Sequence, residues 1–436
     1  MMHANDPGNL GRQFRLVMDC LGPFEPHPRL AVAVSGGADS TALALLTQEW
    51  VCRAGGRVLA LTVDHQLRAA STREADVTLD VLATLGIPGR KLVVADLTRG
   101  PALAERAREA RYRLLLDACA AEGIPHLLLG HHRGDQVETV MMRALSNSAA
   151  SGLAGMPALT ETRFVRLLRP LLDVEPERLR TYLIGLGVAW IEDPSNRDRG
   201  ALRARLREVR ADPSGTSEGT RAIALAAHEM GDHRSRRDRV VAEILAARAA
   251  IRPEGYAVLS PGPIEPEALA ALLRTIAGAP HAPPIDRVAT LARALRPATL
   301  GGVRIMPAGR LGAGWLLVRE PRAMQTPVPA RLSAIWDGRF RLAGGPPNEF
   351  LHDGFPRGGF PGDGCAGVLT LGPLGADAAR FRNRRGPPTS VLHGLPALRL
   401  DGVPVAIPHI GVGDLRWRLL FDPRNRAAGA PFLAGG

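Results

Sequence analysis

The sequence predicts an α/β protein: a doubly wound parallel sheet, then a helical domain, then a small, mostly β C-terminal domain. From about residue 28 to 195, short apolar runs alternate with segments of helical spacing, which is typical of a parallel sheet covered on both faces. A linker at 212–220 precedes further helical segments. A second linker at 326–329 precedes a stretch rich in Gly and Pro with short strand patterns. We therefore expect three domains, over residues 1–212, 220–325 and 330–436.

The first domain should contain four buried strands, at residues 30–34, 58–63, 92–94 and 127–129. Each is a short apolar run bounded by helical segments, and the helices should begin near residues 40, 71, 101 and 135. The second helix opens with Ser71, Thr72, Arg73 and Glu74. This order is typical of a capping box, in which side chains bond the free N–H groups of the first helical turn.

The rest of the chain has weaker patterns. Helical spacing is present at residues 221–250, 266–276 and 285–295, and the first of these segments contains a basic cluster at 233–239. Residues 303–306 and 315–318 favour a pair of strands, and residues 403–407 favour a short strand in the C-terminal domain.

A glycine-containing hexapeptide lies between the first strand and its helix: Ser35, Gly36, Gly37, Ala38, Asp39 and Ser40. Backbone N–H groups at such a turn and helix start point at one spot, with the helix dipole behind them, and so favour an anion. Glycines let the backbone approach a phosphate. No Lys follows, so this is not a Walker A loop. Asp39 would repel a phosphate, which predicts a divalent cation between them, and we expect Mg²⁺.

A second polar cluster begins where the fourth strand ends. Asp135 and Glu138 are three residues apart at a helix start, so their carboxylates can share one face. The pair could receive a substrate ammonium group or hold Mg²⁺ together with Asp39. His131 could donate to a phosphate or carry a proton. The alternative interpretation is that Asp135 is a helix N-cap and Glu138 belongs to a solvated face.

The composition limits the classes of function. Lys and Arg number 55 against 43 Asp and Glu, a net charge of +12, which favours a polyanionic partner such as nucleic acid. A compositional bias towards Arg, Ala, Gly and Pro could account for part of this excess. The four cysteines are far apart, and no long apolar run or signal-peptide core is present. We therefore expect no membrane association and a cytoplasmic location.

The hexapeptide resembles the SGGxDS loop of the N-type ATP pyrophosphatases, the PP-loop superfamily, which have an adenine nucleotide alpha hydrolase-like fold. A longer series resembles one family among them, the bacterial tRNA(Ile)-lysidine synthetases. Seven motifs carry this resemblance in the family's order, at residues 35–40, 63–68, 110–112, 131–139, 152–156, 169–172 and 192–196. Beyond about residue 215 the similarity is one of general layout.

The chain departs from the family's pattern at three places. The family's DDQ is Gly134-Asp135-Gln136, and its glycine-rich segment before residue 152 is replaced at 146–150. Its RNxxR pattern keeps both arginines, Arg203 and Arg207, and loses the Asn. We interpret these changes as divergence within the family.

The resemblance implies an ATP-dependent ligase that joins free L-lysine to carbon 2 of the wobble cytidine of tRNA(Ile) with anticodon CAU, through an adenylated tRNA. The pyrophosphate would leave into the hexapeptide, and Asp39 would hold Mg²⁺. Asp135 and Glu138 would hold the lysine amine and accept its proton, with His131 as a further candidate. Arg203 and Arg207 would contact phosphate or tRNA, and the basic domain after the linker would bind the tRNA body.

Two alternatives stay open from the sequence: a tRNA thiolase of the same superfamily, and a non-catalytic tRNA-binding relative with a degenerate loop. The oligomeric state also stays open, a homodimer being one option.

Overall fold

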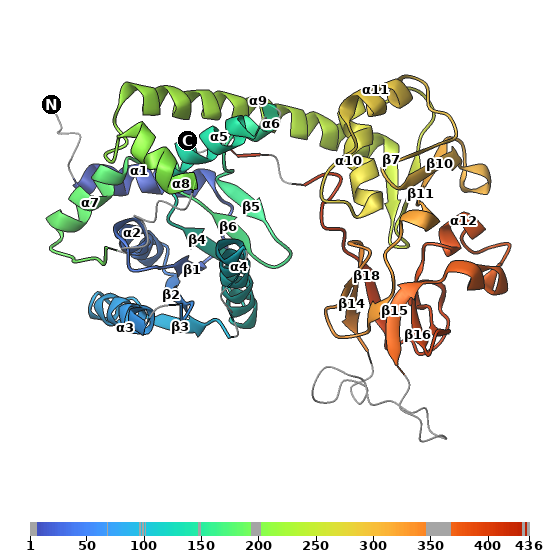
Figure 1. Cartoon of the computed structure of the whole chain (residues 1–436), viewed down its shortest axis with the longest axis horizontal. Coiled ribbons are helices and arrows are strands. Elements are labelled where there is room, and N and C mark those ends of the chain that lie inside the picture. Colours follow the sequence, from blue (N-terminus) through green and yellow to red (C-terminus); the bar gives the residue numbers. More distant parts are fainter. Residues whose placement is uncertain are drawn as a thin grey trace, which may run out of the picture. The chain divides into compact units, whose positions relative to one another are not determined.

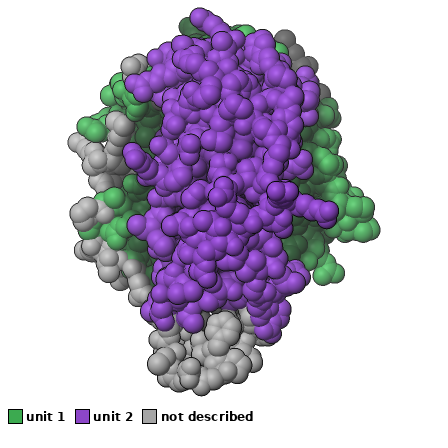
Figure 2. Space-filling view, turned by 90° about the vertical axis from the view of Figure 1, so that its right-hand side faces the viewer, with its two compact units in different colours: residues 1–237, 430–436 green, residues 238–429 purple. Residues whose placement is uncertain are grey.

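The computed structural model describes residues 7–67, 69–95, 97, 100, 102–146, 150–192, 202–345, 368–429 and 432–433. The chain forms two compact units, drawn in Figure 1 and coloured separately in Figure 2. The first comprises Met1–Arg237 with Ala430–Gly436, and the second comprises Asp238–Gly429. The division into three domains stays a prediction.

A six-stranded sheet organises the first unit. Its strands lie in the order β3-β2-β1-β4-β6-β5, and every neighbouring pair is parallel except β5 with β6. The strands are β1 (Arg29–Ala33), β2 (Arg57–Asp64), β3 (Gly89–Val93), β4 (His126–Leu129), β5 (Leu159–Glu161) and β6 (Arg166–Leu168). The chain runs outward from β1 to β3 and then returns to the other side of β1, so a topological switch point lies between β1 and β4.

Helices follow the strands of this unit. They are α1 (Pro7–Cys20), α2 (Ala38–Arg53), α3 (Ala69–Thr84), α4 (Leu103–Ala121), α5 (Arg133–Leu145), α6 (Ala150–Leu153), α7 (Pro176–Gly185), α8 (Leu202–Arg210) and α9 (Glu218–Arg248), the last of which continues into the second unit. Within the described residues, none is long and apolar enough to cross a membrane.

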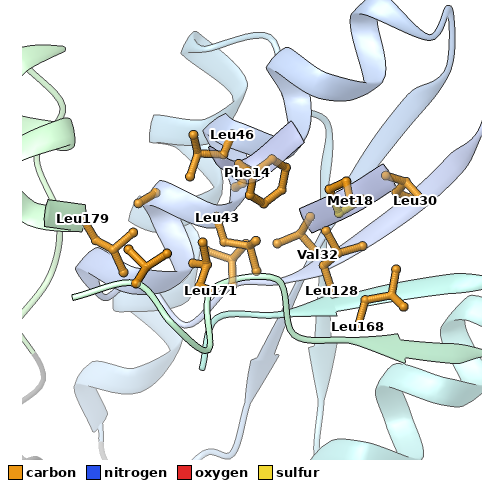
Figure 3. Close-up of a cluster of buried hydrophobic side chains, with 14 of the residues drawn as sticks. Phe14, Met18, Leu30, Val32, Leu43, Leu46, Leu128, Leu168, Leu171 and Leu179 are labelled. Atoms are coloured by element: carbon orange, nitrogen blue, oxygen red, sulfur yellow. The ribbon is translucent and has the colours of Figure 1, made fainter. Parts of the chain in front are cut away.

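Two hydrophobic clusters cover opposite faces of the sheet because side chains alternate along each strand. Leu30 and Val32 of β1 join the cluster that contains residues of α1, α2 and α7 (Figure 3). Ala31 and Ala33, the alternate residues of the same strand, join the cluster that contains Leu115 of α4. The predicted doubly wound parallel sheet is therefore confirmed, as are its four predicted strands.

The predicted capping box is wrong. Helix α3 begins at Ala69, two residues before Ser71. The Ser71 Oγ and Thr72 Oγ1 hydroxyls instead donate to the carboxylate of Asp64, at 2.7 and 2.6 Å. This buried acid at the end of β2 also accepts a hydrogen bond from Gln66 N, and these bonds hold its pKa below the usual range although burial opposes the charge. Asp64 therefore orders the β2–α3 connection.

The second unit is built mainly of antiparallel sheets. The predicted helices near 266–276 and 285–295 are present as α10 (Pro266–Ala277) and α11 (Ile285–Arg293). The predicted strand pair is β10 (Val303–Pro307) with β11 (Trp315–Arg319). These two strands belong to a five-stranded sheet, β7-β8-β11-β10-β9, whose other members are β7 (Ala249–Arg252), β8 (Tyr256–Leu259) and β9 (Ala298–Leu300). Strands of three or four residues carry too little periodicity to be seen in the sequence.

The C-terminal part of this unit has two small sheets, as expected for a mostly β segment. Their strand orders are β12-β15-β16-β17 and β13-β14-β18. The strands are β12 (Val328–Pro329), β13 (Ile335–Trp336), β14 (Phe340–Gly344), β15 (Leu369–Pro373), β16 (Pro396–Leu400), β17 (Val403–Ala406) and β18 (Arg418–Phe421). Short helical turns η2 (Gly309–Leu311) and η5 (Gly375–Phe381) carry exposed arginines.

The segment at 212–220 is ordered around one carboxylate. Asp212 is buried, and its oxygens accept from Ser214 Oγ, Thr216 N, Ser217 N and Thr220 Oγ1 at 2.6–3.2 Å. Burial opposes the charge, but these hydrogen bonds outweigh it and hold the pKa of Asp212 well below its usual range. The carboxylate thereby fixes the turn between α8 and α9.

We predict that Asp212→Ala lowers the free energy of unfolding by about 1–3 kcal/mol at pH 7, because several donors lose a buried acceptor. Since the folded-state pKa is lowered, this stabilisation is present above the unfolded pKa of about 4 and is lost as the pH falls further. Urea unfolding at pH 7 and at pH 3 measures both effects. Asp80→Ala, at an exposed position on α3, is the matched control. An equal loss at the two pH values would contradict the assignment.

Candidate active site at the switch point of the sheet

The hexapeptide connects β1 to α2 at the switch point of the sheet. Gly36 has φ +86°, a left-handed conformation, and a Cβ there would lie 2.5 Å from Thr78 Oγ1. The Ile191 N–H donates to Gly36 O at 2.8 Å and fixes the turn from outside. The N-cap of α2 is Gly37, and it makes no side-chain capping bond. The first N–H groups of α2 are thus left without a capping side chain, as at an anion-binding helix start.

The two serines of the hexapeptide have a structural part. Ser40 Oγ donates to Gly37 O at 3.1 Å and accepts from Ser35 N at 3.1 Å. The Ser35 and Ser40 hydroxyl oxygens are 3.2 Å apart. Both hydroxyls are therefore hydrogen-bonded within the loop, and they stabilise its conformation.

Gly130 is a requirement of this site that was not predicted from the sequence. A Cβ at Gly130 would lie 3.2 Å from both Cα and N of Ser40. The missing side chain lets the first turn of α2 lie directly against the end of β4. The signal available in the sequence was a glycine immediately after a buried strand.

Asp39 stands in the first turn of α2, and its carboxylate accepts no hydrogen bond within the described part of the chain. Oδ1 is buried without a partner, and Oδ2 lies 3.5 Å from Nε2 of His132. Burial, together with the nearby charge of Asp135, raises the pKa of Asp39. A carboxylate that accepts no hydrogen bond among the described residues, beside an anion site, fits a divalent cation. The described residues hold no group of three His, Cys, Asp or Glu side chains able to bind a metal, so Mg²⁺ held by Asp39 would take water and substrate phosphate oxygens as further ligands.

The two acids of α5 do lie on one face, since both contact the same guanidinium. Arg207 of α8 donates from Nε to Glu138 Oε1 at 2.6 Å, and from Nη2 to Asp135 Oδ1 at 3.4 Å. Glu138 is only 1% exposed, so it does not belong to a solvated face. Asp135 Oδ2 also accepts from the backbone N–H of His132, which gives Asp135 a capping role as well.

Neighbouring groups keep both Asp135 and Arg207 ionised. Burial opposes the charge of Asp135, but the hydrogen bond from the His132 N–H and the charge of Arg207 favour it, and the pKa of Asp135 is lowered. Burial likewise disfavours the charge of Arg207, and the contacts with Glu138 outweigh it and raise the pKa of Arg207. Arg203 lies one turn earlier on α8 and makes no hydrogen bond or ion pair to α5 among the residues described.

His131 lies near these carboxylates but belongs to a basic cluster. Burial lowers the pKa of His131 to about 4, and Arg169, Arg111 and Arg108 act in the same direction against Asp135. Burial and Arg111 also lower the pKa of His65. His131 is therefore neutral at pH 7 and able to exchange a proton. Arg111 and Arg169 belong to motifs visible in the sequence, but only the structure brings them to His131.

Two side chains of α5 hold the motif at residues 152–156 in place. The side-chain amide of Gln136 accepts from Met156 N at 2.7 Å and donates to Met156 O at 3.0 Å. Arg143 donates to Gly152 O and Gly155 O, at 2.8 and 2.6 Å. The motif at 152–156 is thus fastened to α5. Arg68, residues 147–149 and residues 193–196, which belong to other segments singled out in the sequence, lie outside the described residues.

A strand, a glycine turn and an uncapped helix start at the switch point, with an acid in place of a phosphate-binding lysine, define a PP-loop protein. The family model of the PP-loop domain matches residues 11–211. Curated relatives identify the family more closely. The chain belongs to the tRNA(Ile)-lysidine synthase family, as the sequence motifs predicted.

Three relatives show the extent of the similarity. The tRNA(Ile)-lysidine synthase of Mesorhizobium japonicum is 35% identical over 362 residues, which cover 80% of this chain and 76% of that protein. That of Ruegeria pomeroyi is 34% identical over 330 residues, covering 73% of this chain and 78% of that protein. That of Bradyrhizobium sp. (strain BTAi1) is 39% identical over 226 residues, or 51% of this chain, and the chain covers 62% of its length, less than two thirds.

We predict that Arg207 and Glu138 are energetically coupled. In a double-mutant cycle with Arg207→Met and Glu138→Met, the coupling free energy of unfolding should be about 1–3 kcal/mol, because each single change leaves a charge of a partly buried pair without its partner. The same cycle with Arg203→Met in place of Arg207→Met is the matched control and should give less than about 0.5 kcal/mol. Equal coupling in the two cycles would show that α8 does not dock through Arg207.

Proposed function

We propose that this protein ligates L-lysine to carbon 2 of the wobble cytidine of tRNA(Ile) with anticodon CAU, and cleaves ATP to AMP and pyrophosphate. The observation that carries the proposal is the meeting of Asp39, at an uncapped helix start, with the carboxylates of Asp135 and Glu138. Membership of the tRNA(Ile)-lysidine synthase family, in which relatives carry that name, supports the substrates.

In the first half-reaction the cytosine 2-oxo oxygen attacks the α-phosphorus of ATP. An oxygen–phosphorus bond forms on the base, the bond from the α-phosphorus to the bridging oxygen breaks, and pyrophosphate leaves. The free N–H groups at the start of α2 would bind the leaving phosphates. A bound Mg²⁺ supplies charge neutralisation there, and Asp39 is the residue that would hold it.

In the second half-reaction the ε-amine of lysine attacks carbon 2, and AMP leaves with the 2-oxo oxygen. The site carries three carboxylates, from Asp39, Asp135 and Glu138, and one guanidinium within hydrogen-bond distance of the α5 pair among the described residues, that of Arg207. With one guanidinium paired to the two α5 carboxylates, this pair keeps a negative charge that can bind a cation. We assign the ammonium group of lysine to the α5 pair, which would also accept the proton released on attack, with His131 as the next acceptor.

The tRNA body needs a basic surface, and the second unit presents an arginine loop, residues 382–385. Arg310 of η2 donates to three backbone carbonyls around it, those of Asn383, Arg384 and Gly386, at 3.3, 2.8 and 2.6 Å. The carbonyls are thereby held on one guanidinium, while the side chains of Arg384 and Arg385 are exposed. A loop ordered in this way loses little entropy when it binds phosphates.

We predict that Asp39→Asn reduces lysidine formation by on the order of a hundredfold or more, because one preorganised charge at the leaving pyrophosphate is lost. The unfolding free energy should stay equal or rise, since burial raises the pKa of Asp39 and its ionisation at neutral pH opposes folding. Mass spectrometry of nucleosides from CAU tRNA, after incubation with enzyme, ATP and lysine, measures the product. If wild-type enzyme forms no lysidine, the proposed function is wrong; if the variant forms it within a few-fold of wild type, only the role of Asp39 is wrong.

We predict that Arg384→Ala with Arg385→Ala weakens tRNA binding and lowers the slope of log affinity against log salt by about one for each phosphate that the loop no longer binds. ATP binding should be unchanged, because the loop lies in the other unit. Arg53→Ala, which removes an exposed arginine already paired with Glu49, is the control and should leave the slope as it is. Identical slopes for the loop variant and wild type would exclude this loop from the tRNA surface.

A further inference from the structure

His132 occupies a position between the backbone of α5 and two carboxylates of the site. It is the N-cap of α5, and only 12% of its side chain is exposed. Its two ring nitrogens face different partners. Nδ1 accepts a hydrogen bond from the backbone N–H of Gly134 at 2.9 Å. Nε2 lies 3.5 Å from Oδ2 of Asp39 and 3.7 Å from Oδ2 of Asp135.

The capping bond fixes the tautomer of the ring. A nitrogen that accepts an N–H carries no proton, so the ring proton of neutral His132 is on Nε2. The N–H donor is therefore directed at the edge where the carboxylates of Asp39 and Asp135 meet. Two like charges at one edge repel each other, and the N–H dipole at Nε2, which is 3.5 and 3.7 Å from the two carboxylate oxygens and forms no hydrogen bond with them, reduces that repulsion.

Gly134 makes this arrangement possible, and it is the position where the chain departs from the family's DDQ. A Cβ at residue 134 would lie 2.7 Å from Cε1 and 3.0 Å from Nδ1 of His132. It would also lie 3.3 Å from Nη2 of Arg210, whose Nη1 donates to Gly134 O at 3.1 Å. The glycine thus leaves room for the ring of His132 to cap the helix in this position.

We propose that His132 is a positioning residue, which holds the Asp39 carboxylate in place for the cation and the nucleotide by a donor at Nε2, while Nδ1 anchors the ring to α5. The inference rests on the proposed function, because it requires that Asp39 serves a nucleotide site. The competing interpretation is that His132 only caps α5.

Two substitutions distinguish the roles of the two ring nitrogens. His132→Asn keeps an acceptor where Nδ1 stands and removes the distant donor, and Asn is a good N-cap. His132→Gln keeps an amide N–H near the place of Nε2 and removes the capping acceptor. If His132 positions Asp39, His132→Asn should lose more nucleotide affinity than His132→Gln. His132→Gln should then lose more stability than His132→Asn. If His132 only caps the helix, Gln should be the worse in both respects.

The measurement is calorimetric binding of α,β-methylene ATP to the full-length protein, with Mg²⁺ and with a chelator, alongside urea unfolding. We expect His132→Asn to weaken the Mg²⁺-dependent part of binding roughly 10–100-fold with an unchanged urea midpoint. His132→Gln should lower the midpoint and bind within about threefold of wild type. Wild-type affinity in His132→Asn would overturn the inference alone. Absence of Mg²⁺-dependent binding in wild type would overturn the nucleotide site itself, and the inference with it.

Gly134→Ala tests the same geometry from the other side. The new Cβ should displace the ring and weaken Mg²⁺-dependent binding as His132→Asn does. Gly219→Ala is the matched control, because Gly219 is also the second residue of a helix and a Cβ there meets nothing within 4 Å. If Gly134→Ala binds as tightly as Gly219→Ala, the position of the ring does not govern the site.

Discussion

The first unit depends on a group of carboxylates whose charges are unfavourable in a partly buried position and therefore oppose folding. Asp39, Asp135 and Glu138 meet at the carboxyl ends of β1 and β4, where burial penalises each charge. Arg207 compensates the α5 pair, and Asp39 is left with a raised pKa and a buried oxygen without a hydrogen-bond partner among the described residues. Stability alone would not retain such a group. Its charge is consistent with a site that binds cations, namely a metal ion from solvent and the ammonium group of a substrate.

The surrounding residues hold these carboxylates in fixed positions relative to one another. Gly36 and Gly130 allow the loop and the start of α2 to approach their neighbours, and Gly134 makes room for His132. Arg207 and Arg210 fasten α8 to α5, and Asp212 fixes the turn that follows. The segment from α8 to α9 is therefore fixed to the site by hydrogen bonds, although the sequence around 212–220 has the composition of a linker.

Much of this was accessible from the sequence, and the rest was hidden for physical reasons. Apolar runs predicted the strands of the parallel sheet, because a strand buried on both faces must be apolar throughout. Spacing placed Asp135 and Glu138 on one helical face. Long-range partners could not be predicted in this way: Arg207 is 69 residues from Glu138. Ser71 and Thr72 matched a capping box, yet both bond Asp64 instead, because a buried carboxylate competes strongly for hydroxyl donors.

Following the α-phosphate of ATP tests the proposed chemistry most directly. Enzyme and CAU tRNA are incubated with ATP labelled at the α-phosphorus, without lysine, and lysine is then added. We expect the label to appear on the tRNA first and to leave as AMP once lysine is present, because adenylation and amine attack are separate steps at one site. Label that never reaches the tRNA, or AMP release that needs neither tRNA nor lysine, would contradict this two-step reaction.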